Sequence, residues 1–304
     1  MQQNWTEKKE RGSEFLLRFI VWIAKTLGRP ATRALLYPIT LYFMLAAADS
    51  RRASVLYLSK VLPHKPRWRD VFRHFHSFSS VVLDRLFFLL GRADLFDVHV
   101  MGDAYDAADS ATTGNGVFLM GAHLGSFEVL RLVARKHDAV QLVLLMYEEN
   151  AKKIGALMAA INPEAQQEIV SLGNLSAMLV VKDRLAEGAV IGILADRILN
   201  DEKCFTTPFF GRPANLPLGP FKLAAMMRRP VFLMVGLYQG KNRYDVYLEK
   251  IADFGDADLS GREKTTAAIE AAMRLYVERL EYFCRLSPYN WFNFYDFWQN
   301  TTHD

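Results

Sequence analysis

The spacing of hydrophobic and polar positions changes near residue 92 and divides the chain into two parts. Before that point the apolar positions follow the 3.6-residue period of a helix, with breaks at Gly28-Arg29-Pro30 and at Pro63 and Pro66. The pattern predicts helices over 15–27, 34–48, 50–62 and 68–90. The first 92 residues are therefore expected to be entirely helical.

From Gly91 onward, short apolar runs alternate with helical ones. We predict strands at 96–101, 117–120, 140–146, 169–171, 190–194, 231–238 and 244–251, and helices at 127–136, 151–160, 175–187, 217–228 and 262–286. The runs at 117–120, 140–146 and 190–194 are continuously apolar, as expected of strands buried on both faces. This alternation predicts an α/β fold with a central mixed, mostly parallel sheet flanked by helices.

Composition and charge indicate that the N-terminal part of the chain contacts a membrane or another anionic surface. The chain has 304 residues, of which 51% are hydrophobic and 23% charged, which is typical of globular proteins and argues against a disordered one. The longest uncharged apolar run, 34–48, contains Pro38 and is shorter than the roughly 20 residues of a membrane-spanning helix. Residues 1–92 hold 16 Lys/Arg against 6 Asp/Glu, a net charge of +10, whereas the rest of the chain carries −6. A basic, apolar segment on an acidic body suggests a surface that meets anions.

The predicted helix over 15–27 has the composition of an interfacial helix. Arg11, Arg18 and Lys25 recur every seven residues, and aromatic residues such as Trp22 cover the opposite side. Packing of this helix on the protein's own core is the alternative. An acidic partner protein is another candidate for the basic surface, whereas nucleic acid fits least because the segment is amphipathic and apolar. We predict a helical membrane-associating region over 1–92 and an α/β domain over 93–304 that ends in an aromatic segment.

Cysteine and histidine positions argue against a disulfide scaffold and a metal site. Cys204 and Cys284 are far apart in the sequence, without CxxC or Cys/His metal spacing, which favours a reducing compartment. His74 and His76 fall in a predicted helix without further ligands nearby, so no metal is expected there. The N-terminus has no signal-peptide pattern.

The most informative stretch is GVFLMGAHLGSFE, residues 116–128. It predicts a buried strand, a glycine-containing turn and a helix, and active sites of open α/β sheets lie at the carboxyl ends of strands. His123 falls in the turn, and Glu128 can reach it only from one turn into the helix. An imidazole held by a carboxylate is the arrangement that a general base needs. A core histidine bonded to a backbone carbonyl is the other interpretation of this spacing.

Four short blocks follow one another along the α/β part of the chain. The first is HLGSFE from His123 to Glu128. The others are GILADR ending at Arg197, PFFGRPA from Pro208 with Gly219 following, and the Pro-led strand at Arg229-Pro230-Val231. The first block is similar to the H-x4-[DE] signature of the lysophospholipid acyltransferase superfamily, and the four in this order resemble most closely the bacterial lipid A late acyltransferases. The final segment, YNWFNFYDFW from Tyr289, lacks the basic residues usual in lipid A enzymes and is similar to a branch associated with aryl-polyene-type lipid pigments.

This resemblance implies an O-acyltransferase that moves a fatty acyl group from acyl carrier protein or coenzyme A to a hydroxyl of a lipid or glycolipid. His123 would be the general base and Glu128 would orient it; the substrate-binding candidates are Asp196, Arg197, Gly211, Arg212 and Asn215. No cofactor is expected beyond the acyl thioester. The implied location is the cytoplasmic face of the bacterial inner membrane, as a peripheral protein or with a short N-terminal membrane segment. An acyl-ester hydrolase of the same fold and a non-catalytic membrane-bound assembly protein are the alternatives.

Overall fold

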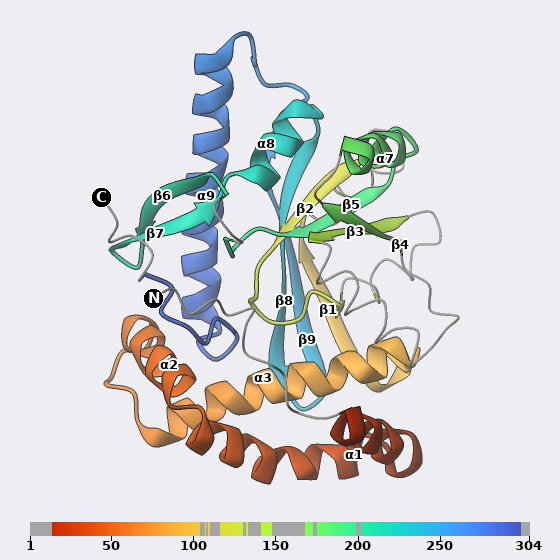
Figure 1. Ribbon diagram of the computed structural model, residues 1–304, viewed down its shortest axis with the longest axis vertical. Helices are drawn as coiled ribbons and strands as arrows, with labels where there is room; N and C mark the ends of the chain where they lie inside the picture. The colour runs from red at the N-terminus through yellow and green to blue at the C-terminus, as the bar shows by residue number, and fades with distance from the viewer. Residues whose placement is uncertain are drawn as a thin grey trace.

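The computed structural model describes residues 14–103, 107, 109, 116–129, 132, 141–147, 168–172, 175–198 and 202–298; for 14–25 and Leu27 it describes the backbone only. The helix predicted over 151–160 and most of that over 127–136 lie outside these residues, as do the Arg11 side chain and those of Arg18 and Lys25. The described part is an α/β fold with a seven-stranded mixed sheet and a separate two-stranded hairpin (Figure 1).

Three helices, α1 (Glu14–Ala46), α2 (Ala48–Val61) and α3 (Trp68–Leu89), gather at one end of the molecule, with α1 and α3 packed together (Figure 1). The predicted break at Gly28 is a kink inside α1, where Gly28 adopts a φ of 72°. Within the described residues, no helix is by itself long and apolar enough to cross a membrane. The segment Gly28–Ala46 meets those criteria only together with Ala48–Val61, to which it is bent by 96°.

The main sheet has the order β1-β9-β8-β2-β5-β3-β4. Its strands are β1 (Asp97–Gly102), β2 (Val117–Gly121), β3 (Leu142–Tyr147), β4 (Glu168–Leu172), β5 (Val190–Leu194), β8 (Pro230–Gly240) and β9 (Arg243–Asp253). Every strand pair is parallel except the β8–β9 hairpin, so the prediction of a mixed, mostly parallel sheet is confirmed. The other described elements are η2 (Ala93–Leu95), α7 (Leu175–Ala186), α8 (Gly219–Met226) and α9 (Arg262–Leu286).

The hairpin of β6 (Cys204–Phe209) and β7 (Arg212–Pro217) was not predicted from the sequence. Three prolines lie in its strands, and proline removes a backbone donor from the ladder, so the segment has the composition of a loop. A turn of only two residues joins the paired strands of this hairpin. Phe210 and Gly211 both adopt positive φ there, of 50° and 73°.

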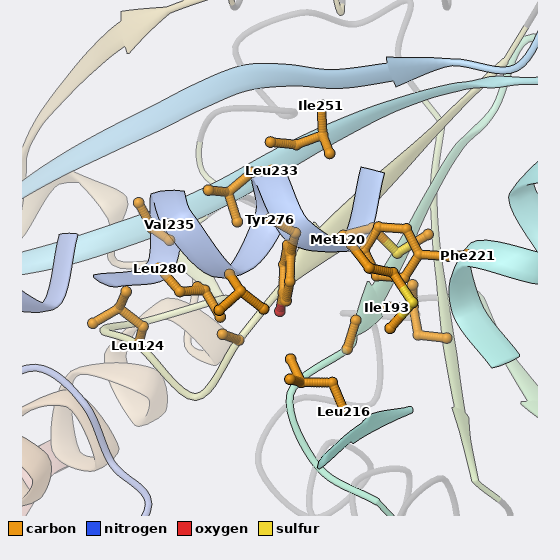
Figure 2. Packing of buried hydrophobic residues seen from close by; sticks show 14 of the residues in the cluster. Met120, Leu124, Ile193, Leu216, Phe221, Leu233, Val235, Ile251, Tyr276 and Leu280 are labelled. Atoms are coloured by element: carbon orange, nitrogen blue, oxygen red, sulfur yellow. The ribbon is translucent and has the colours of Figure 1, made fainter. Parts of the chain in front are cut away.

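Alternate positions of the central strands fill two cores on opposite faces of the sheet. Phe118 and Met120 of β2 pack with α9 residues such as Tyr276, whereas Val117 and Leu119 pack on the side of α3. Figure 2 shows Tyr276 among the surrounding aliphatic side chains of β2, β5 and β8. Burial on both faces explains why these strands lack polar positions.

A buried ion pair ties the N-terminal helices to the sheet. Arg29 of α1 contacts the Asp84 carboxylate of α3 through two nitrogens, at 2.8 and 2.9 Å. The Tyr244 hydroxyl of β9 donates to the same carboxylate at 2.9 Å, and Asp84 is fully buried. A buried charge persists only with such partners. The kink at Gly28 therefore lies next to the point where α1 is fixed to the body.

Candidate functional site

The site lies where two neighbouring parallel strands end side by side. In the register of β2 and β5, Gly121 pairs with Leu194, and the Ala195 amide donates to the Gly121 carbonyl at 2.9 Å. His123 and Asp196 each follow their strand end by two residues. The parallel register therefore brings these two side chains together, although they are 73 positions apart in the sequence.

The Asp196 carboxylate holds His123 at two points. Its Oδ1 lies 2.9 Å from the imidazole Nδ1, and its Oδ2 accepts a hydrogen bond from the His123 amide at 3.0 Å. The Asp196 side chain is fully buried, whereas 29% of the His123 side chain is exposed. An ionised carboxylate can only accept, so Nδ1 carries the proton and Nε2 keeps its lone pair. The ring thus offers a proton acceptor.

Electrostatics favour a neutral imidazole beside an ionised carboxylate. Burial lowers the pKa of His123, and Arg197 lowers it further, while Asp196 and Glu128 oppose the shift. Burial raises the pKa of Asp196, but His123, Arg197 and Asn293 outweigh it and bring the pKa to about 2. At neutral pH the pair therefore consists of a neutral base and an anion. This is the protonation state of a general base before it takes a proton.

Glu128 occupies a different position from the one expected. The hydrogen bond to the His123 ring comes from Asp196, and Oε1 of Glu128 lies 2.8 Å from Nε of Arg85 in α3. Glu128 acts on the imidazole through its charge, which raises the pKa of His123. The orienting contact expected of Glu128 is thus made by Asp196 in the structure.

The aromatic C-terminal segment contacts both the His123 loop and Asp196. The sequence did not predict these contacts. The Phe292 amide donates to the His123 carbonyl at 2.7 Å, and the Gly125 amide donates to the Asn290 carbonyl at 2.8 Å. Asn293 donates from Nδ2 to Oδ2 of Asp196 at 2.9 Å. The available signal was the two asparagines within a largely aromatic run, because a buried polar side chain must find hydrogen-bond partners.

The other predicted substrate-binding residues divide into two groups. Arg197 lies within the site: its Nε donates to Oδ1 of Asn293 at 2.7 Å, and its Nη2 donates to the Phe292 carbonyl at 3.1 Å. Gly211, Arg212 and Asn215 lie on the β6–β7 hairpin. Arg212 stacks on the Trp298 ring there, and Asn215 accepts from the Thr206 hydroxyl. The hairpin contacts therefore connect to the end of the aromatic segment rather than to His123.

The two histidines of α3 have separate surroundings. His74 is fully buried, with Nδ1 2.8 Å from the Ser54 hydroxyl and Nε2 2.6 Å from the Trp291 carbonyl. His76 lies against the rings of Tyr37 and Phe72. Among the described residues, no group of three or more His, Cys, Asp or Glu side chains is placed to hold a metal ion.

Comparison with known families gives a match over most of the α/β part of the chain. Residues 95–300 match the family described as bacterial lipid A biosynthesis acyltransferase. The match covers more than half of the chain and includes all four sequence blocks, which confirms the predicted resemblance. No curated protein matches the chain.

Proposed function

We propose, since this chain belongs to the bacterial lipid A biosynthesis acyltransferase family, that it transfers a fatty acyl group from a thioester donor to a hydroxyl of a lipid or glycolipid, with His123 as the general base. The observation that carries the proposal is the contact between Nδ1 of His123 and Asp196 at the paired strand ends. This contact fixes the tautomer that leaves Nε2 as the proton acceptor.

In this reaction His123 takes up one proton and releases it again, so the enzyme ends in its starting protonation state. Nε2 of His123 takes the proton of the acceptor hydroxyl while the oxygen attacks the thioester carbonyl. The tetrahedral intermediate then collapses, the carbon–sulfur bond breaks, and the imidazolium gives its proton to the departing thiolate. The charges of Asp196 and Glu128 stabilise the imidazolium, since both raise the pKa of His123. No covalent intermediate on the protein is required.

We propose acyl carrier protein or coenzyme A as the donor, because each carries its thioester on a phosphate-bearing arm. Arg212 is the guanidinium that we assign to such a phosphate, because it is exposed at the hairpin turn and stacked on Trp298. Arg197 instead binds the Asn293 side chain and the Phe292 backbone, which assigns it to the construction of the site. Two classes of acceptor fit this proposal. Membership of the family favours a lipid A precursor. The aromatic C-terminal segment favours a pigment-type glycolipid.

We also propose that the outer face of α1 lies on the cytoplasmic side of the bacterial inner membrane. Large apolar side chains are exposed there in consecutive turns: Leu35, Tyr37, Leu41, Tyr42, Phe43 and Leu45. Contiguous apolar patches of this kind mark sites of membrane or protein interaction. The next helix, α2, begins at Ala48 and carries Arg51 and Arg52 near its start. These basic side chains follow the apolar face directly, where lipid phosphates would lie.

Acyl transfer is tested with His123→Ala, and His99→Ala, an exposed histidine paired with Asp97, is the matched control. Loss of the general base should lower turnover by at least about 10²-fold, whereas the control should match the wild type. Mass spectrometry of lipids from cells with and without the gene identifies the acylated product and so the acceptor. Undiminished turnover in His123→Ala refutes the base, and acceptor-independent release of fatty acid at the full rate indicates a hydrolase.

Membrane seating is tested by flotation with vesicles that contain anionic lipids. Tyr42→Glu/Leu45→Glu should abolish flotation, because it places two charges in the apolar face. The matched control is Leu179→Glu/Met226→Glu, which changes two equally exposed apolar side chains on α7 and α8. We expect the wild type and the control to float even in 1 M salt. Release of the wild type by salt alone, or equal loss in the control, contradicts the assignment.

A further inference from the structure

The Asn293 side chain stands between the two charged groups next to His123. Its Nδ2 donates to Oδ2 of Asp196 at 2.9 Å, and its Oδ1 accepts from Nε of Arg197 at 2.7 Å. Asn293 is 2% exposed, so water cannot take over these contacts. Each of its two polar atoms therefore has one charged partner.

We propose that Asn293 is a positioning residue for acyl transfer, which keeps Asp196 available to the His123 ring. The inference rests on the proposed function of His123 as the base. It extends the site into the C-terminal segment, more than 150 positions along the chain from His123.

The chemistry of an amide explains why this position needs asparagine. An amide donates from one end and accepts at the other, so a single side chain can serve a carboxylate and a guanidinium together. It thereby stands between Asp196 and Arg197. A guanidinium that paired directly with the Asp196 carboxylate would compete with Nδ1 of His123 for it. The contact of Asn293 also lowers the pKa of Asp196, in agreement with a donor held against the anion.

The groups that face Asp196 define the pH range in which the test is clear. His123 and Arg197 are its charged neighbours, and Tyr276, Cys284 and Tyr295 interact with it electrostatically. Burial raises the pKa of each of these last three groups above its ordinary value. They therefore stay protonated between about pH 5 and pH 9, since their ordinary pKa values are already about 8.5 to 10. The charge of Glu128 acts on the imidazole as well and raises the pKa of His123.

The experiment compares pH profiles of kcat for wild type, Asn293→Asp and Asn293→Ala. Asn293→Asp has the same size and keeps the acceptor for Arg197, but it turns the donor toward Asp196 into a second carboxylate. Two carboxylates at this distance share one proton, because one of the two pKa values is strongly raised. Activity should therefore fall at alkaline pH as that proton is lost, which gives a descending limb that the wild type lacks. Asn293→Ala should lower kcat by about 10- to 100-fold, as expected for the loss of a hydrogen bond to a charged group.

Asn290→Ala is the matched control, because Asn290 is equally buried in the same segment but holds the Tyr238 backbone and the Ser287 hydroxyl. It should lower the melting temperature and leave the shape of the pH profile unchanged. A profile of Asn293→Asp parallel to the wild type, with His123→Ala inactive, overturns the role of Asn293 alone. Full activity in His123→Ala overturns both proposals. The isosteric Asn293→Asp decides the question even where Asn293→Ala does not fold.

Discussion

Replacement of Asp196 by asparagine is the sharpest test of the catalytic geometry, because it keeps the shape and exchanges one acceptor for a donor. In the wild type, Oδ2 accepts from the His123 amide and from Asn293, while Oδ1 faces the imidazole Nδ1. In Asp196→Asn, the new side-chain amide keeps both accepted bonds only with its oxygen at the Oδ2 position. Its NH₂ group then faces Nδ1, which must accept, so the proton moves to Nε2 and removes the lone pair that the reaction needs.

The magnitude follows from this change of tautomer. An asparagine in place of the aspartate of a His–Asp pair lowers kcat by about 10⁴-fold where the same tautomer switch occurs. Here we expect about 10³- to 10⁴-fold, or about 4 to 5.5 kcal/mol of transition-state stabilisation. The residual rate should come from binding and orientation of the two substrates.

The assay measures thiol release from the acyl thioester in the presence of the acceptor, together with thermal unfolding. Asp245→Asn is the control: this carboxylate is also buried but pairs with Arg243 near the start of β9. It should keep the wild-type turnover. A folded Asp196→Asn within tenfold of the wild type would refute the reasoning, and Glu128 would then be the carboxylate to test.

Three further predictions concern stability. Burial lowers the pKa of His74 to about 4, so the unfolded chain binds an extra proton at this residue as the pH falls from 6.5 to 4. Over that range the wild type should lose about 3 kcal/mol more unfolding free energy than His74→Gln, whose side chain can still donate to the Trp291 carbonyl. Urea unfolding at several pH values measures the difference. An equal pH dependence in both proteins would contradict a buried neutral His74. Gly125→Ala should lower the melting temperature of the protein by more than Gly91→Ala does. Both glycines have φ above 70°, but only at Gly125 would an added Cβ overlap the Gly236 carbonyl. Equal melting temperatures of the two variants would show that the loop can move away. Arg29→Met should cost about 3 to 5 kcal/mol, because it leaves the Asp84 carboxylate buried without its cation, whereas Arg92→Met at an exposed pair should leave the melting temperature unchanged. A smaller loss in Arg29→Met than in Arg92→Met would contradict this assignment.

The sequence predicted the elements of the fold better than their contacts. Apolar runs such as Val190–Leu194 identify strands because burial on both faces leaves no polar position. The β6–β7 hairpin was missed because its prolines suit a loop as well as an edge strand. The register of β2 against β5 cannot be predicted from the hydrophobic period or from local propensity, because it is set by packing between distant segments.

The same limit applies to the site. His123 was identified from its position after a strand, and the position of Asp196 after another strand was also visible. Their hydrogen bond depends on the two strands being neighbours, which strand order decides and a single sequence does not show. Glu128 was expected at the ring because it is near in sequence, yet its carboxylate pairs with Arg85 of α3. Asn293 was not among the predicted site residues, because most of the segment around it is aromatic and no strand precedes it.

The hydrogen bonds between the C-terminal segment and the His123 loop affect the order in which the chain folds during its synthesis on the ribosome. Domains fold in the order in which the ribosome delivers their parts, and contacts between distant residues form late. The helices before residue 92 and the strands that carry His123 and Asp196 are complete long before Asn293 is synthesised. A nascent chain therefore carries both members of the pair without the group that separates Asp196 from Arg197. The contacts around His123 and Asp196 are therefore completed last, long after α1, α2 and α3 have been synthesised.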